Sequence, residues 1–129
     1  MPARAEDWYK QASHDLQHAH HALESGDYEW ACFAAQQACG KALKALYQKA
    51  GAEAWGHSVA LLLKNLPPPF SAEPALQQMG MQLDKHYIPA RYPNAYPEGA
   101  PYEFYTQPEA EHAIASAERI IRFCEDHLA

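Results

Sequence analysis

Several features of specialised proteins are missing from this sequence. No apolar run approaches the roughly 20 residues that a membrane-spanning helix needs. The opening residues, MPARAEDWYK, hold no apolar segment of the kind found in signal peptides. We therefore expect a soluble, cytoplasmic protein that does not contact a membrane.

Cysteine and basic residues are scarce as well. Of the three cysteines, Cys32 and Cys39 stand seven positions apart in a predicted helix, which separates their Cα atoms by about 10 Å and prevents a disulfide. Together with Cys124 they are expected to be buried thiols in a reducing compartment. Ten lysines and arginines against 16 aspartates and glutamates give a net charge of −6. This balance argues against an extended nucleic-acid surface but allows a small basic site.

Familiar catalytic and cofactor motifs are absent too. The sequence has no GxSxG, no phosphate-binding glycine loop, no dinucleotide-binding glycine pattern and no CxxC, which disfavours a conventional hydrolase or redox enzyme. His14, His18 and His21 have spacings that a metal ion could bridge, but they fall on the polar face of a predicted helix. We expect exposed histidines there, and neither a metal site nor a cofactor.

What the sequence does contain is helical periodicity. Apolar residues recur in steps of three or four near the N-terminus, which predicts an amphipathic helix. They are Ala5, Trp8, Ala12, Leu16, Ala19 and Leu23. We expect Gly26 to end this helix and Asp27 to cap the next one.

The following residues, 28–51, predict the most deeply buried helix of the chain. Its narrow polar strip holds Gln37, Lys41 and Lys44. Gly40 interrupts this helix at a cost of about 1 kcal/mol relative to alanine, and we attribute it to the close approach of another helix.

Three further helices are predicted towards the C-terminus. A short helix follows the cap Ser58, a longer one spans about 71–88, and Thr106 with Glu109 forms a capping box at the start of the last. We predict one all-α domain over residues 1–129. It is an up-and-down antiparallel bundle of four long helices and one short helix, with a long ordered loop before the last.

That loop is rich in proline and tyrosine and reads HYIPARYPNAYPEGAPYEFY, residues 86–105; we call it the strap. Its prolines and aromatic residues predict an ordered segment lying on the bundle. Arg91 beside Tyr92 suits a phosphate or a nucleobase. Alternatively, the strap simply covers the bundle and Arg91 pairs with a carboxylate such as Asp84. We expect His86 to be the histidine nearest a site.

Short segments follow one another along the chain in a specific order. They are Trp8, LESGDY (23–28), FAAQQA (33–38), KALKAL (41–46), His57-Ser58 with Leu62, Leu83-Asp84, HYIP (86–89) and RYP (91–93). This order, which covers nearly the whole chain, resembles the HEPN family, small helical domains of prokaryotes that also occur in larger eukaryotic proteins.

The resemblance implies a helical bundle that commonly forms homodimers. It also implies association with a separately encoded minimal nucleotidyltransferase, often as a toxin–antitoxin-like pair, and nucleotide binding by some members. Many members are metal-independent ribonucleases whose arginine and histidine are separated by four to six residues. In that scheme the arginine holds the phosphate and the imidazole moves protons.

This sequence departs from the ribonuclease pattern, because no histidine follows Arg91 within that range. Arg122 and His127 have the spacing, but they lie at the end of the last helix and off one another's face. We interpret them as a chance match.

The leading prediction is therefore a non-catalytic subunit that binds a nucleotide or a nucleotidyltransferase. Its predicted ligand-binding residues are Gln37, Lys41, Lys44, Asp84, His86, Arg91 and Tyr92. One alternative is a metal-independent ribonuclease that uses Arg122 and His127, or a displaced histidine such as His86. The other is a structural homo-oligomeric module. Binding of RNA stays open.

Overall fold

The computed structural model describes residues 3–129, and within them every regular element is a helix. Three helices of 22 residues dominate: α1 (Ala3–Glu24), α2 (Tyr28–Lys49) and α5 (Gln107–Leu128). Two shorter ones, α3 (Val59–Lys64) and α4 (Pro74–Asp84), lie between α2 and α5 along the chain. The all-α prediction is confirmed.

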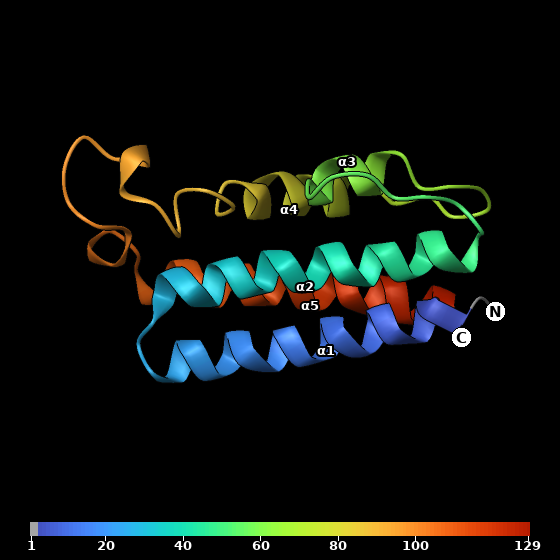
Figure 1. The fold of residues 1–129 in the computed structure, drawn as a ribbon, viewed down its shortest axis with the longest axis horizontal. Coiled ribbons are helices and arrows are strands. Elements are labelled where there is room, and N and C mark those ends of the chain that lie inside the picture. The colour runs from blue at the N-terminus through green and yellow to red at the C-terminus, as the bar shows by residue number, and fades with distance from the viewer. Residues whose placement is uncertain (1–2) are drawn as a thin grey trace.

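The helices alternate in direction along the bundle (Figure 1). α1 runs from the end that carries both termini, α2 returns beside it, α4 runs back, and α5 returns next to α2. α3 packs against α4 as a short antiparallel partner. α2 thus contacts all four other helices, which explains why its sequence is the most apolar.

Alanines form much of the contact between α1 and α2. Ala5, Ala12 and Ala19 of α1 are fully buried, and their small side chains let the two helix axes approach closely. The turn between the helices uses Gly26 with a positive φ of 79°, as predicted. The expected cap is wrong, because the Asp27 side chain makes no capping hydrogen bond.

Two glycines inside helices differ in what surrounds them. A Cβ on Gly80 of α4 would lie 3.0 Å from the backbone nitrogen of Ala60, so this glycine permits the close packing of α4 on α3. A Cβ on Gly40 of α2 would meet nothing within 4 Å. The prediction that Gly40 reflects helix packing is therefore wrong.

Helix α4 is shorter than the sequence predicted. It was expected to span about 71–88, but it begins at Pro74 and ends at Asp84. Residues 85–91 continue as hydrogen-bonded turns, in which the amides of His86 and Tyr87 bond to carbonyls three residues back. Pro89 has no amide hydrogen to extend a helix, so the chain leaves α4 through tight turns that aim successive side chains in different directions.

The strap is ordered but lies at one end of the bundle. It contains two 3₁₀ turns, Pro93–Ala95 and Pro101–Glu103, and it passes around the end where α1 meets α2 and α5 begins (Figure 1). Only part of it is buried: Ala90 and Pro101 are buried, whereas Tyr92 and Tyr102 remain exposed.

Two further expectations concern the interior and the membrane. All three cysteines are buried free thiols, as predicted, and burial raises the pKa of Cys32 to about 12. Among the helices of residues 3–129, none combines the length and the apolar character needed to cross a membrane.

Candidate functional site

Arg91 is held by a group of aromatic rings. Its guanidinium carbon lies 4.3 Å from the ring centre of Phe33, 4.6 Å from that of Tyr87 and 5.1 Å from that of Tyr92. The Nε atom donates a hydrogen bond of 2.8 Å to the Tyr87 carbonyl. Among residues 3–129, no hydrogen bond or ion pair engages the two terminal nitrogens. The rings fix the plane of the cation and leave its donor end without a protein partner.

Asp84 is not the partner of Arg91, contrary to the alternative drawn from the sequence. Its carboxylate accepts hydrogen bonds from the Ser58 hydroxyl at 2.7 Å and from the amides of Val59 and Ala60 at 2.8 and 3.1 Å. The amide nitrogen of Gln36 also donates to it, at 3.1 Å. Asp84 therefore accepts hydrogen bonds from the free backbone amides at the N-terminus of α3. The carboxylate that was predicted to bind a ligand already accepts from four donors.

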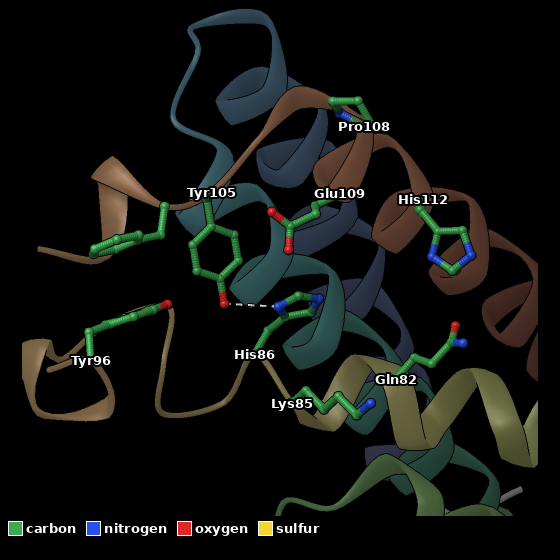
Figure 2. Close-up of a pocket in the computed structure, with 9 residues that line it drawn as sticks. Gln82, Lys85, His86, Tyr96, Tyr105, Pro108, Glu109 and His112 are labelled. Carbon is green, nitrogen blue, oxygen red and sulfur yellow. Dashed lines mark hydrogen bonds between the residues drawn. The ribbon is translucent and has the colours of Figure 1, made fainter.

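His86 points to a different side of the α4 end than Arg91 does. Its Nδ1 lies 2.9 Å from the Tyr105 hydroxyl, in a hollow of about 610 Å³ that Glu109 and His112 also line (Figure 2). Burial lowers the pKa of His86. The structure thus separates His86 from Arg91, which the sequence had placed in one site.

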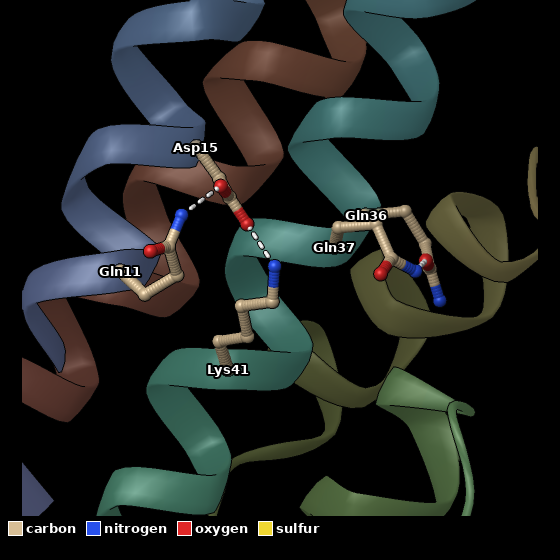
Figure 3. Close-up of polar contacts among 5 residues, drawn as sticks. All are labelled: Gln11, Asp15, Gln36, Gln37 and Lys41. Atoms are coloured by element: carbon tan, nitrogen blue, oxygen red, sulfur yellow. Dashed lines mark hydrogen bonds and ion pairs between the residues drawn. The ribbon is translucent and has the colours of Figure 1, made fainter. Parts of the chain in front are cut away.

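The polar strip predicted on α2, Gln37, Lys41 and Lys44, is partly exposed, and its side chains make several polar contacts (Figure 3). Lys41 forms an ion pair of 2.6 Å with Asp15 of α1, which also accepts a hydrogen bond from Gln11. Gln37 donates to the side-chain oxygen of Gln36 at 2.8 Å. The Asp15 carboxylate balances the charge of Lys41, so this lysine adds little free positive charge.

Lys44 differs from Lys41 because no carboxylate among the described residues pairs with it. Its ammonium nitrogen lies 5.6 Å from the ring centre of Trp8. Partial burial, and then the neighbouring Lys41, lower the pKa of Lys44. Within residues 3–129, Lys44 and Arg91 are thus two cations without acidic partners, on a protein whose net charge is −6.

Two hollows lie along the polar strip of α2, and Arg91 adjoins them through its contact with Phe33. One of about 230 Å³ is lined by Phe33, Trp30, Gln37 and Lys41, among others. A second of about 170 Å³ also includes Gln37 and Lys41, and adds Trp8, Gly40, Lys44 and His57. His57 stacks on Tyr87, with ring centres 5.3 Å apart. We call this surface the α2 face; it comprises Phe33, Gln37, Lys41 and Lys44 of α2, with Trp8, Trp30, His57, Tyr87, Arg91 and Tyr92.

Arg122 and His127 line one hollow of about 370 Å³ beside α5, together with Asp126. That they lie off one another's helix face stays a prediction. The Nδ1 atom of His127 is 2.8 Å from the Phe123 carbonyl, and its ring also packs against Phe70.

The α1 histidines match the prediction. His18 and His21 are exposed, as is His14. Within the described residues, no three histidine, cysteine or acidic side chains are arranged to hold a metal ion.

Sequence reasoning missed Phe33, Tyr87 and Trp30 as parts of the site. Phe33 precedes Gln37 by four residues and therefore shares its helix face, which is the signal in the sequence that could have found it. Tyr87 falls inside the helix that the sequence predicted over about 71–88. The early end of α4 turns its ring instead against Arg91 and His57.

Comparison with known proteins agrees with this fold over nearly the whole chain. The HEPN domain family model matches residues 5–127. The crystal structure of TT1696 from Thermus thermophilus is 48% identical, has a TM-score of 0.94 and matches over 98% of both chains. An archaeal HEPN homologue is 45% identical, with a TM-score of 0.82 over 98% of both chains.

A HEPN domain protein from Thermotoga maritima is 44% identical, with a TM-score of 0.77 over 95% of this chain and 97% of its own. A search of curated proteins returned no match. The family model and these near full-length relatives agree with the order of segments seen in the sequence, and the chain belongs to the HEPN domain family.

Proposed function

We propose that this HEPN protein is a non-catalytic subunit that binds a nucleotide on the α2 face. The observation that carries the proposal is the state of Arg91. Its guanidinium is fixed between Phe33, Tyr87 and Tyr92, while its terminal nitrogens have no partner among the described residues. A planar cation held in this way presents paired donors that match a phosphate.

The surroundings of Arg91 fit the remaining parts of a nucleotide. Lys44 supplies a second cation for which the described residues offer no acidic partner. Trp30 is 46% exposed and lines the hollow next to Phe33, and exposed aromatic rings of this kind stack on bases. An anion and a flat ring are therefore both accommodated on one surface.

Calorimetric titration with ATP and with AMP tests this proposal. We expect Arg91→Ala to weaken binding at least tenfold, and Arg91→Lys to recover it only partly because lysine keeps the charge but loses the planar donors. Arg119→Ala is the matched control, since Arg119 forms only an exposed ion pair with Glu73. Equal affinities for the wild type and Arg91→Ala, or no binding of either nucleotide at millimolar concentration, would refute the proposal.

A subunit contact on the same face is the second candidate function. The exposed Trp30 favours it, because tryptophan is enriched where proteins bind one another. The partner would be a minimal nucleotidyltransferase or a second copy of this chain. Co-expression with a minimal nucleotidyltransferase, followed by sedimentation with and without Trp30→Ser, decides this. A monomer at micromolar concentration that does not bind the enzyme rejects the candidate.

Ribonuclease activity is favoured by one observation, the shared hollow of Arg122 and His127. Incubation of the purified protein with structured RNA checks it, with His127→Ala and His86→Ala as variants. Cleavage that either variant abolishes would overturn the non-catalytic assignment; intact RNA would support it.

A further inference from the structure

The hollow of about 610 Å³ around His86 has a wall of stacked rings that the α2 face does not share. The rings of Tyr96 and Phe104 lie parallel, with centres 4.6 Å apart and planes 10° apart. Both line the hollow. Phe104 is still 47% exposed, so an apolar ring surface is available to a ligand.

This wall is fixed in place by its neighbours. The Tyr96 hydroxyl donates a hydrogen bond of 3.1 Å to the Pro89 carbonyl. Gly99 has a positive φ of 86°, and a Cβ there would lie 2.8 Å from the Phe104 ring. The backbone thus packs directly against Phe104, and the rings need little ordering when a ligand stacks on them.

Next to the wall, His86 offers a hydrogen-bond donor. Burial lowers the pKa of His86 and raises that of Tyr105, which favours a neutral imidazole and a protonated phenol. We take the tautomer in which the Tyr105 hydroxyl, 2.9 Å away, donates to Nδ1, which places the imidazole hydrogen on Nε2. Figure 2 shows this second ring nitrogen on the side of His86 that faces away from Tyr105.

Glu109 offers an acceptor on the same hollow. Its Oε1 accepts hydrogen bonds from the amide and hydroxyl of Thr106 at 3.1 and 3.2 Å. No hydrogen bond among residues 3–129 uses its Oε2. The charge of Lys85, which also lines the hollow, balances that of Glu109. The lining is therefore close to neutral, unlike the α2 face, whose Lys44 and Arg91 have no acidic partner in the described part of the chain.

We propose that this hollow binds an uncharged planar heteroaromatic ring, of the size and polarity of a nucleobase or nucleoside. The ring stacks on the wall of Tyr96 and Phe104, and its polar edge lies between the His86 donor and the Glu109 acceptor. Each nucleobase carries hydrogen-bond donors and acceptors along one edge. These groups complement the donor of His86 and the acceptor of Glu109. The site does not depend on Arg91, so it can be tested independently of the proposed function.

Nuclear magnetic resonance of the whole protein tests the site. On titration with adenosine or cytidine at millimolar concentration, we expect shifts of the His86 and His112 imidazole resonances and of the Tyr105 ring. We also expect adenosine and AMP to bind this site with affinities within about threefold, because its charge is balanced. No shifts with any nucleoside, or AMP binding there more than tenfold tighter than adenosine, would overturn the proposal.

Variants locate the binding independently. Phe104→Ala is expected to weaken adenosine binding at least tenfold, and Tyr102→Ala, which changes a 68% exposed ring of the same strap outside the hollow, is expected to leave it unchanged. Glu109→Gln keeps a residue that suits the capping box and should weaken binding several-fold without unfolding α5. Adenosine binding that survives Phe104→Ala and Glu109→Gln but is lost in Arg91→Ala would place the nucleoside on the α2 face and reject this site.

Discussion

Asp84, His86 and Arg91 lie within eight positions of one another, yet their side chains end in three different places. Asp84 points to the N-terminus of α3, His86 to the hollow beside Tyr105, and Arg91 to the rings of the α2 face. The turns after α4 produce this divergence. Residues that sequence reasoning grouped into one site therefore have three separate chemical roles.

Asp84→Asn should destabilise the protein by about 2 kcal/mol, because charged hydrogen bonds of this kind contribute about 1.5–3 kcal/mol. The amide that replaces one carboxylate oxygen cannot accept from Ser58 and the α3 backbone. Urea unfolding measures the change. Asp7→Asn is the control, since Asp7 forms only an exposed pair with Arg4 and should change stability by less than about 0.5 kcal/mol. Equal effects of the two variants would contradict the role assigned to Asp84.

The stability of the protein should fall as the pH is lowered through the titration of His86. Burial lowers its folded-state pKa from 6.5, against the opposing pull of Glu109 and with smaller lowering by His112 and Lys85. The unfolded chain therefore takes up this proton first as the pH falls below about 6.5, which favours unfolding. Above that pH the imidazole is neutral in both states and contributes no pH dependence.

Denaturation of the wild type and His86→Gln at about pH 7.5 and pH 5.5 checks this effect. The other seven histidines are common to both proteins, so the difference between the two isolates His86. We expect a smaller loss of stability on acidification in the variant. An identical loss would mean that His86 titrates alike in the folded and unfolded chains.

At the scale of helices, Gly80 sets the distance between α3 and α4. Its missing side chain leaves room for the backbone of Ala60, at 3.0 Å from where a Cβ would lie. Backbone cannot swing aside as a flexible side chain can, so Gly80→Ala should force the helices apart. We expect a loss of about 1–3 kcal/mol, typical of overpacking, measured as a lower urea midpoint; an unchanged midpoint would contradict the packing described here.

The opposite of the effect at Gly80 is expected for Gly40 of α2, where an alanine substitution should stabilise the protein. Nothing lies within 4 Å of its would-be Cβ, and alanine is the better helix former by about 0.8–1 kcal/mol. Gly40→Ala should therefore raise the urea midpoint. Since Gly40 also lines the hollow with Trp8 and Lys44, the same variant tests whether the α2 face keeps this position open for a ligand.

The starts of α3 and α5 were predicted correctly, because each carries a local capping signal. Ser58 accepts from the Leu61 amide at 3.1 Å, and Thr106 with Glu109 forms the expected box. The end of α4 was not predictable in the same way. Pro89 marks where a helix cannot continue, but the helix had already given way to tight turns after Asp84.

For the whole molecule, the order of short segments along the chain was enough to identify the family and the bundle. The site was only partly predictable. Gln37, Lys41 and Lys44 share a surface, as their spacing indicated, and Arg91 reaches the same surface through Phe33. The role of Asp84 depends on tertiary contacts with α3, which no local pattern in the sequence reports.

The α2 face and the hollow of His86 and Glu109 differ in the charge of the residues that line them. The α2 face has two cations that no described acidic group pairs with, whereas the hollow of His86 and Glu109 is balanced. A phosphate is attracted to the first and a neutral ring fits the second. The end of α4 and the turns after it supply residues to both sites.

A crystal structure of the protein grown with ATP tests the central claim most directly. The account predicts phosphate oxygens within hydrogen-bond distance, about 2.7–3.2 Å, of the terminal nitrogens of Arg91, with its guanidinium still stacked on Phe33 and Tyr87. An ATP molecule bound elsewhere, with no phosphate contact to Arg91, would contradict it.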